Sequence, residues 1–370
     1  MSAPHPAITA DTSCRLLEVD FSGIEAVITG WYLHRHEIDA VGAPLYIRMA
    51  RLGIHAGVAA MAAGKPVDWS QSDEDVRAYL KEIKKVHADL YDPCKRVVHG
   101  NNFGMSIHGM VEKFPQYFAT LKVAETFQGH YYALAPGLPK WHLALRQHAQ
   151  KHGWLGGVAL KGSAPSIWTH PYGYRHAFWD VLSLRPVKDY DALKWLRDPK
   201  RAWRIQRLHG RYFASAMGGD ANRVIAFYPQ STAAGRLKEV QLRLFLPDSP
   251  DYIGDAYFGR TPLLVPIHDS LVMQIPNRAW DRVVERVIRV MQDPSEKLPI
   301  PASWGWGPYL PIGISAKAGK NWAPADGNNP QGMAEIPVPV WLYQEPDAPV
   351  LPREGEGDVD DWKALERSVA

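Results

Sequence analysis

The chain has 370 residues, of which 46% are hydrophobic and 22% charged, so it is long enough for a substantial core and more than one subdomain. It contains no run of about 18 apolar residues and no N-terminal signal-peptide pattern, which excludes a membrane span and predicts no secretion. The two cysteines, Cys14 and Cys94, are too few for a disulfide scaffold or a cysteine-rich zinc site. A cytoplasmic location is therefore expected.

The net charge of +3 is distributed unevenly along the chain. Residues 345–370 hold eight acids and three bases, a net charge of −5, so the rest of the chain carries +8. A basic body suits a polyanionic partner, although charge alone does not separate DNA from RNA or from an acidic protein. The acidic tail, 345–370, is poor in apolar residues and is expected to be disordered.

The first predicted element is a short apolar strand at 16–19, which ends at Asp20. Residues 22–25 have the spacing of a capping box, Ser-x-x-Glu, so a helix is expected to start there. Residues 45–63 and 73–91 are predicted to form two further helices, which a Gly-Lys-Pro turn separates.

Asp92-Pro93 predicts another helix start, with a capping acid before a proline, and this helix should extend to about Ile107. Lys95, His99 and Phe103 follow one another at intervals of four and would share one face. A cation, an imidazole and an aromatic ring in one stripe can hold phosphates and stack on a base. The plainer interpretation is a surface helix whose Phe103 enters the core.

Helices are expected to about residue 151, followed by an aromatic region rich in Gly and Pro at 153–180. Residues 185–211 contain nine Lys or Arg and three Asp. This pattern is typical of a solvated helix face, and equally of a track for nucleic-acid phosphates. The stretch 298–341 is rich in Pro, Gly and Trp and is predicted to be irregular.

A helix is predicted from about Thr232 to Phe245. Two apolar strands, 263–267 and 271–275, then flank His268-Asp269-Ser270, which predicts a tight hairpin. Asp269 therefore sits at a hairpin tip, and Asp20 at the end of the first strand.

Either acid alone is most often a turn residue. If the fold brings the two strands side by side, Asp20 and Asp269 together could bind two divalent ions, which would clamp the attacking and leaving oxygens of a phosphoryl transfer. Hard oxygen ligands favour Mg²⁺.

Three segments in order resemble motifs A, B and C of family A (Pol I-like) DNA polymerases: VDFSGIE (19–25), KRVVHGNNFGMS (95–106) and IHDSLV (267–272). Four lesser landmarks stand in the same order as in that family: Ile54-His55, YGYR (172–175), PQSTAA (229–234) and GKNW (319–322). The resemblance covers about residues 14–325.

The resemblance implies an α/β (α+β) fold, in which an antiparallel palm sheet holds an inserted, mostly helical fingers subdomain. Residues 14–30 and 205–325 would form the palm, and 31–204 the fingers with connecting insertions. The implied activity is template-directed DNA synthesis, in which a primer 3′-hydroxyl attacks the α-phosphate of a deoxynucleoside triphosphate (dNTP). The implied partners are primer-template DNA and dNTP.

By the same resemblance, Asp20 and Asp269 would hold two Mg²⁺ ions with help from the backbone carbonyl of Phe21. His55 and Lys95 would contact the triphosphate.

Phe103 would pack against the incoming nucleotide, and Glu25 would block a ribose 2′-hydroxyl. Arg175, Gln230 and His268 would contact the DNA minor groove at the primer terminus, where contacts depend little on sequence. Without the resemblance, Arg175 and His268 are ordinary turn residues and Gln230 a helix N-terminal residue.

The chain departs from the family pattern at three places. His99 replaces the lysine that touches the triphosphate and can protonate pyrophosphate, and an imidazole with a reference pKa of about 6.5 is largely neutral at pH 8. Ser270 replaces the third acid of motif C. Ile107 replaces a tyrosine of motif B.

Only 19 residues precede Asp20, too few for the family's thumb or 3′–5′ exonuclease domain. The expectation is a phage-like, split polymerase whose thumb or exonuclease lies on a separate polypeptide in the host cytoplasm. Two alternatives are a single-subunit RNA polymerase, against which Glu25 argues, and a non-catalytic DNA-binding replisome subunit.

Overall fold

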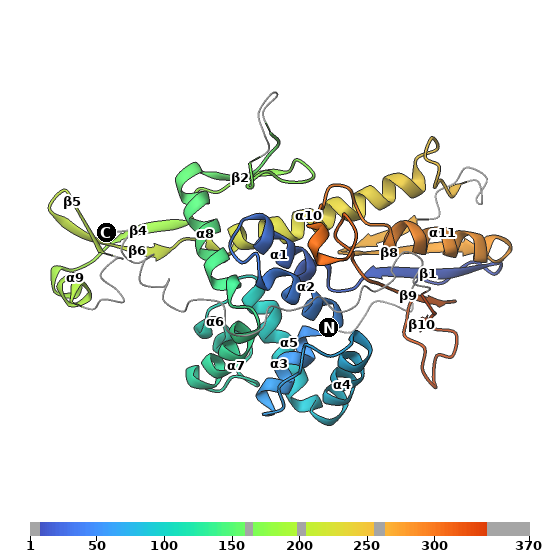
Figure 1. Cartoon of the computed structure of the whole chain (residues 1–370), viewed down its shortest axis with the longest axis horizontal. Helices are drawn as coiled ribbons and strands as arrows, with labels where there is room; N and C mark the ends of the chain where they lie inside the picture. The colour runs from blue at the N-terminus through green and yellow to red at the C-terminus, as the bar shows by residue number, and fades with distance from the viewer. Residues whose placement is uncertain (1–7, 160–165, 198–204, 255–262, 339–370) are drawn as a thin grey trace.

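A computed structural model describes residues 8–159, 166–197, 205–254 and 263–338 (Figure 1). Its centre is a five-stranded sheet in the order β10-β9-β1-β8-β7, in which every pair of neighbours is antiparallel. A mostly helical segment is inserted between β1 and β7. The α/β fold class expected from the sequence, with its antiparallel sheet and inserted helices, is confirmed.

The strands of this sheet lie at the two ends of the described chain and meet around β1. They are β1 (Cys14–Phe21), β7 (Leu263–Ile267), β8 (Ser270–Pro276), β9 (Ile314–Gly319) and β10 (Ala334–Glu335). Along β1 the side chains alternate: Leu17, Val19 and Phe21 are buried, whereas Glu18 and Asp20 are only partly buried. Since successive strand residues point to opposite faces, the two acids project from the open face of the sheet.

Two helices cover the sheet and its edge. The helix α11 (Trp280–Gln292) contacts β1, β8 and β9, and its valines at 283, 287 and 290 are buried. The long helix α10 (Ala221–Phe245) contacts both α11 and α1. In Figure 1 α10 runs across the middle of the molecule and α11 lies along the sheet. The face of the sheet that α11 covers is therefore closed.

The inserted helices form a second body, most of which lies below the sheet in Figure 1. They are α1 (Ile24–Arg35), α2 (Gly42–Leu52), α3 (Ile54–Ala62), α4 (Asp73–Val86), α5 (Ala88–Asn102), α6 (Ile107–Lys113), α7 (Leu121–Leu134) and α8 (Gly137–His152). The helices α3 and α5 pack against each other, and α1 packs on α2 and α10. The core is continuous from the sheet into these helices.

Two smaller sheets complete the insertion. The first pairs β2 (Trp154–Gly156) with β3 (Arg175–Ala177). The second has the order β4-β6-β5, from β4 (Leu182–Pro186), β5 (Ile205–Leu208) and β6 (Arg211–Met217), and is accompanied by α9 (Asp189–Leu196). Figure 1 shows this second sheet projecting away from the rest. The predicted fingers–palm boundary at 204/205 falls between its strands, and the subdomain limits remain predictions.

Several predicted helix limits were wrong. Residues 45–63 form two helices, α2 and α3, because Gly53 breaks them with φ of 128°. The capping box at 22–25 does not form: Gly23, in the left-handed region, is the N-cap of α1, and no side chain caps the helix. The helix predicted at 73–91 ends at Val86.

The helix predicted to start at Asp92-Pro93 begins earlier, at Ala88, so Pro93 lies inside α5. It also ends earlier than predicted, at Asn102, and Phe103 is its C-cap. The cause of the early end is Gly104, whose φ of 69° turns the chain away from the helix. A Cβ at Gly104 would lie 2.4 Å from Cδ1 of Ile225, so the tight turn needs glycine.

Three other segments also differ from the prediction. The helix α10 begins at Ala221, eleven residues before the predicted start at Thr232, and contains Pro229. The stretch 298–341, predicted to be irregular, supplies β9 and β10. The basic stretch 185–211 is not one helix but contains parts of β4, β6 and all of α9 and β5. The acidic tail, 345–370, lies outside the described residues.

A buried arginine joins α10 to the end of α11. The side chain of Arg236 is only 2% exposed, and its Nη2 donates to the carbonyl oxygens of Val290, Met291 and Asp293 at 3.1, 3.3 and 2.5 Å. These are carbonyls at the C-terminal end of α11, which the helix itself leaves without partners. The guanidinium therefore caps α11 from a neighbouring helix.

We expect Arg236→Met to lower the free energy of unfolding by about 2–4 kcal/mol, because it removes the charge and leaves buried carbonyls unsatisfied while keeping much of the volume. Urea unfolding measures this loss. The matched control is Arg223→Met on the same helix, where the side chain is 68% exposed and the expected change is within about 0.5 kcal/mol. Equal losses in the two variants would contradict the capping role.

Candidate active site

The pairing of β1 with β8 brings the two predicted acids to the same end of these neighbouring strands. The antiparallel register places Asp20 opposite Ser270, so Asp269 immediately precedes the partner residue of Asp20. The backbone N–H of Phe21 donates to the carbonyl oxygen of Asp269 at 3.2 Å. Two carboxyl groups that are far apart in the sequence therefore become direct neighbours.

Asp269 is held in a two-residue hairpin turn between β7 and β8, since Ile267 pairs with Ser270. His268 has φ of 52°, the left-handed conformation that such short turns require. The hydroxyl of Ser270 is buried and donates to the carbonyl of Ile267 at 3.0 Å. Ser270, in place of a third acid, therefore closes the turn.

The two carboxyl groups interact strongly. Burial raises the pKa of Asp20 to about 7, with further contributions from the charge of Asp269, a hydrogen bond to Asp269 and the charge of Glu18, while Lys317 lowers it. At pH values below about 7 the pair therefore holds a proton, and above that pH it holds excess negative charge. A cation bound between the two groups would relieve this repulsion.

The donor set around this pair consists of oxygens. In the part of the chain that the structure describes, no three or more His, Cys, Asp or Glu side chains form a metal-binding group. Two carboxylates and a backbone carbonyl suit Mg²⁺, which keeps several waters and takes further ligands from substrate phosphates. They do not suit zinc, which prefers nitrogen and sulfur ligands.

Glu25, in the first turn of α1, lies beside the acid pair. Burial raises its pKa, the charge of Asp269 raises it further, and the charge of His268 lowers it. The electrostatic coupling places Glu25 near both residues of the hairpin turn. Glu25 takes no part in a helix cap, so capping does not account for its position.

Three residues predicted to contact a triphosphate gather on α3 and α5. The rings of His55 and His99 stack with centroids 5.4 Å apart and an interplanar angle of 27°. Burial lowers the pKa of His55 to about 4, and the charges of His99, Lys95 and Lys84 add to this effect. Burial also lowers the pKa of His99, with Lys95 and Arg96 contributing. The lowered pKa values favour neutral imidazoles, so the positive charge beside them comes from Lys95, Lys84 and Arg96, and a bound anion would complement it.

Phe103 lies beside this cluster although it is outside the helix. A pocket of about 430 Å³ is lined by His99, Phe103, Arg96, Lys113 and Asn222, among others. The predicted neighbourhood of His99 and Phe103 is therefore present, produced by the turn after α5.

The three residues predicted to contact DNA lie on different elements. Arg175 is exposed on β3, with its guanidinium 4.3 Å from the ring centroid of Trp154. Gln230 is exposed on α10, and His268 is exposed at the hairpin tip. Of these, His268 is coupled to the acid pair through Glu25. The DNA contacts themselves stay predictions.

Two residues that the sequence patterns did not single out, Lys317 and Glu18, both act on Asp20. Glu18 pairs with Lys317 across β1 and β9. The available signal was the strand-like alternation in ISAKAG (314–319), which the surrounding Pro and Gly residues obscured.

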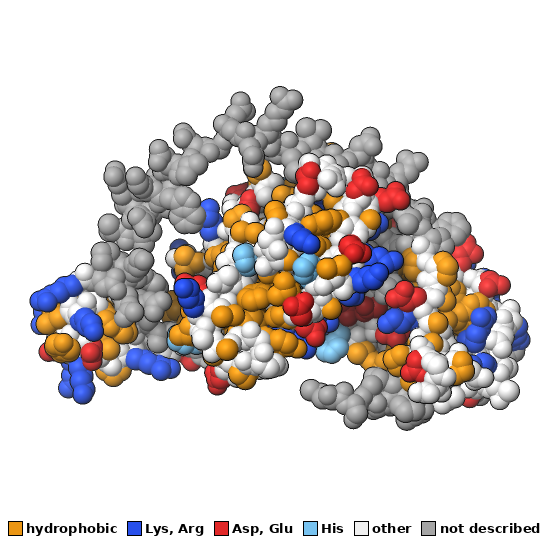
Figure 2. All heavy atoms as spheres, turned by 90° about the horizontal axis from the view of Figure 1, so that it is seen from below, with side chains coloured by type: hydrophobic (Ala, Val, Ile, Leu, Met, Phe, Trp, Pro, Cys, Tyr) orange, Lys and Arg blue, Asp and Glu red, His pale blue; other side chains and the backbone are white. Residues whose placement is uncertain are grey.

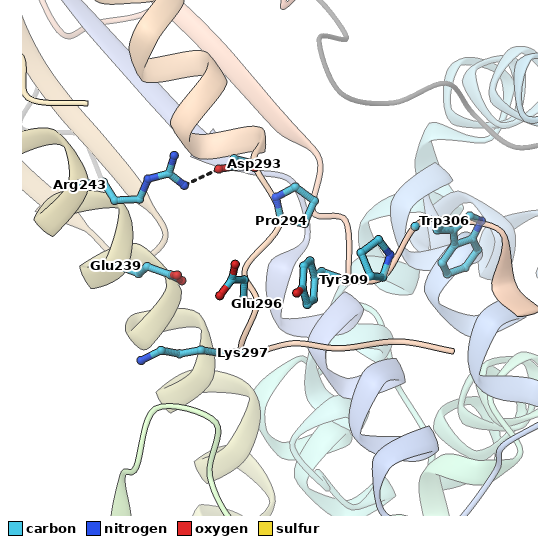
Figure 3. Close-up of a pocket in the computed structure, with 10 residues that line it drawn as sticks. Glu239, Arg243, Asp293, Pro294, Glu296, Lys297, Trp306 and Tyr309 are labelled. Atoms are coloured by element: carbon cyan, nitrogen blue, oxygen red, sulfur yellow. Dashed lines mark hydrogen bonds and ion pairs between the residues drawn. The ribbon is translucent and has the colours of Figure 1, made fainter. Parts of the chain in front are cut away.

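A second pocket, of about 440 Å³, lies between α10 and the segment that follows α11 (Figure 3). Two of its acids, Asp293 and Glu239, are already paired. Asp293 accepts from Arg243 at 2.5 Å, and Glu239 accepts at 2.8 Å from Tyr172, whose hydroxyl also lies 3.2 Å from that of Ser295 after α11. These contacts hold α10 against the segment after α11, so the pocket has a structural role.

No family model and no curated protein sequence matches the chain. Among solved structures, the chain is similar to the POL domain of Pol1 from M. smegmatis, described in complex with DNA primer-template and dNTP. The TM-score is 0.51 at 16% sequence identity, and the match covers 86% of this chain. The chain spans 41% of the length of that neighbour.

This likeness shows the fold: the chain has the architecture of a Pol I-type polymerase domain. The described residues include no helix long and apolar enough to cross a membrane.

We expect Asp20→Asn to stabilise the metal-free protein at pH 8. The pKa of Asp20 in the folded state, about 7, lies above the ordinary value of 3.8, so the wild-type protein loses stability as the pH rises from about 4 to about 7. The asparagine removes this loss, a gain of about 1–2 kcal/mol at pH 8 after allowance for solvent screening. Thermal unfolding in EDTA measures it.

In the same thermal-unfolding experiment at pH 8, MgCl₂ in place of EDTA should stabilise the wild-type protein, since a ligand that binds the folded state raises its stability. Asp20→Asn should respond little. The matched control is Asp248→Asn, at an exposed position, which should behave as the wild-type protein does, both in EDTA and with MgCl₂. If the stability of the wild-type protein does not change between pH 4 and pH 8, the ionisation of Asp20 beside Asp269 does not destabilise the folded state.

Proposed function

We propose that this protein catalyses template-directed DNA synthesis, in which a primer 3′-hydroxyl attacks the α-phosphate of a dNTP and releases pyrophosphate. The observation that carries the proposal is the contact between Asp20 and Asp269 at the strand ends, in a fold like that of a polymerase domain. The neighbour's complex with primer-template and dNTP supports the same substrates.

Asp20, Asp269 and the backbone carbonyl of Phe21 would hold two Mg²⁺ ions. Bound there, the ions would stabilise negative charge on the attacking and leaving oxygens. The raised pKa of Asp20 supports this assignment, since the folded protein keeps two carboxyl groups in contact at an energetic cost.

The chain's own side chains would bind and orient the nucleotide. Lys95 would hold the triphosphate through its charge, and the stacked rings of His55 and His99 beside it would do so through their N–H groups. Phe103, at the same pocket as His99, would pack against the nucleotide. Glu25, beside Asp269, would exclude a ribose 2′-hydroxyl.

Arg175, Gln230 and His268 would contact the minor groove near the primer terminus, where their exposed polar groups can act independently of sequence. A separate polypeptide with a thumb or exonuclease domain stays a prediction, which primer extension with and without candidate partner chains would test.

Primer extension with Mg²⁺ tests the function. We expect wild-type protein to add dNTPs in preference to rNTPs, and Asp269→Ala to reduce the rate by on the order of 10³-fold or more, because the ion site loses one of its two carboxylates. Fluorescence anisotropy should show unchanged primer-template binding by this variant. Asp248→Ala, at an exposed position, is the control and should keep full activity.

Other results would select the alternatives. Extension with rNTPs alone would indicate a single-subunit RNA polymerase. Tight DNA binding without any synthesis would indicate a non-catalytic replisome subunit.

We expect His99→Lys to make synthesis less sensitive to pH. The pKa of His99 is lowered from 6.5. At pH values above 6.5 the protonated fraction of His99 therefore falls about tenfold for each pH unit. A lysine stays charged to about pH 10. Single-nucleotide addition from pH 6 to 9 should therefore decline with rising pH in the wild-type protein and flatten in the variant.

The control is His108→Lys on the exposed surface of α6, which should keep the wild-type profile. If His99→Lys and wild-type profiles coincide, His99 takes no part in proton transfer or charge stabilisation.

A further inference from the structure

The projecting three-stranded sheet and its helix form an arm, defined as residues 181–197 and 205–218. The root of the arm, where its two strands leave the body, is held by a clasp of backbone hydrogen bonds to the carboxylates of two aspartates. The N–H of Gly219 donates to the carboxylate of Asp180 at 2.7 Å, and the N–H of Trp179 donates to that of Asp220 at 3.0 Å. A Cβ at Gly218 would lie 2.1 Å from the carbonyl oxygen of Asp180. The arm is therefore fixed in direction where it leaves the body.

The surface of the arm is basic. Its described residues include six cations and only two acids, Asp189 and Asp191. All six cations are exposed: Arg185, Lys188, Lys194, Arg197, Arg207 and Arg211. Figure 2 shows Lys and Arg side chains gathered at this end of the molecule. Such a surface complements a polyanion.

Aromatic rings accompany these charges. Trp179 at the root is 89% exposed, and Tyr190 on α9 is 78% exposed. A pocket of about 440 Å³ at the root is lined by Trp154, Trp179 and Arg175, among others. Exposed aromatic rings beside cations are the combination that binds single-stranded nucleic acid, since unpaired bases stack on the rings while cations contact the phosphates.

The root of the arm adjoins the nucleotide pocket. Asn222, two residues after the clasp residue Asp220, lines the pocket that also contains His99 and Phe103. Arg146 donates to the carbonyl of Ala221 at 3.1 Å and to the side chain of Asn222 at 3.2 Å. A strand that leaves this pocket towards Asn222 therefore reaches the root of the arm, from which the basic surface extends outward towards α9 and β5 (Figure 1).

We propose that the arm binds single-stranded DNA that extends beyond the nucleotide pocket. The placement of that strand as template rests on the proposed function, whereas the binding itself does not require synthesis. Duplex DNA shields its bases from stacking, so the exposed rings favour a single strand as the occupant. An acidic protein would share the charge complementarity but not the dependence on nucleic-acid length.

The test measures fluorescence anisotropy of the full chain on primer-templates whose single-stranded overhang is either about 3 or about 25 nucleotides. We compare wild-type protein with Lys188→Gln/Lys194→Gln/Arg207→Gln and with Tyr190→Ala. The matched control is Lys65→Gln/Lys81→Gln/Lys85→Gln, which removes three exposed cations near α3 and on α4. Titrations are repeated across salt concentrations.

Wild-type protein should prefer the long overhang. The arm triple variant should lose about tenfold in affinity for it, with a salt slope smaller by about 2, since each lost phosphate contact on a single strand removes about 0.7. Tyr190→Ala should weaken the same binding by about fivefold or more. Binding to the short overhang, and all binding by the control, should change little.

Equal affinity of wild-type and arm variants for the long overhang would overturn the proposal, as would preference for a 25-base-pair duplex in place of the overhang. Primer extension by the wild-type protein separates the two ideas. If the protein extends primers but the arm variants bind the long overhang as tightly as the wild-type protein does, only the proposed role of the arm is rejected. If binding depends on the arm but no primer is extended, only the polymerase function is rejected.

Discussion

The register between β1 and β8 is the constraint on which the site depends. Because side chains alternate along a strand, a slip of one residue would turn Asp20 into the core and bring Phe21 to the open face. The buried set Leu17, Val19 and Phe21 fixes this register, since any other pairing would expose it to water. The hydrophobic core thereby imposes the contact between two like charges that would otherwise separate.

The electrostatics of the site have a common pattern. The pKa values of Asp20 and Glu25 are raised, partly by neighbouring carboxylates, and those of His55 and His99 are lowered, partly by neighbouring cations. One end of the site would be stabilised by a cation and the other by an anion. Burial is the largest cause of all four shifts. A metal-bound triphosphate, the proposed substrate, would bring a cation to one end of the site and an anion to the other.

Sequence patterns predicted the elements that carry the acids, because β1, β7 and β8 are apolar runs bounded by polar turns. They failed where tertiary packing overrides local preference. Pro93 and Pro229 indicated helix starts, yet both lie inside longer helices whose buried faces compensate for a missing hydrogen bond. The strand β9 was missed because the surrounding Pro and Gly residues obscured its alternation. The site roles required the family resemblance, since periodicity alone favoured a surface helix for Lys95, His99 and Phe103.

The long helix α10 joins three parts of the molecule. Its N-terminus carries the clasp at the arm, and Arg236 near its other end is buried against α11. Between them, Pro229 has no N–H to offer the carbonyl of Ile225, so the rod is weakest over this turn. The side chain of Ile225 is also the one that crowds Gly104, directly after α5. A bend at Pro229 would therefore move Ile225 against the turn that follows α5, so one helix links the position of the arm to the position of that turn.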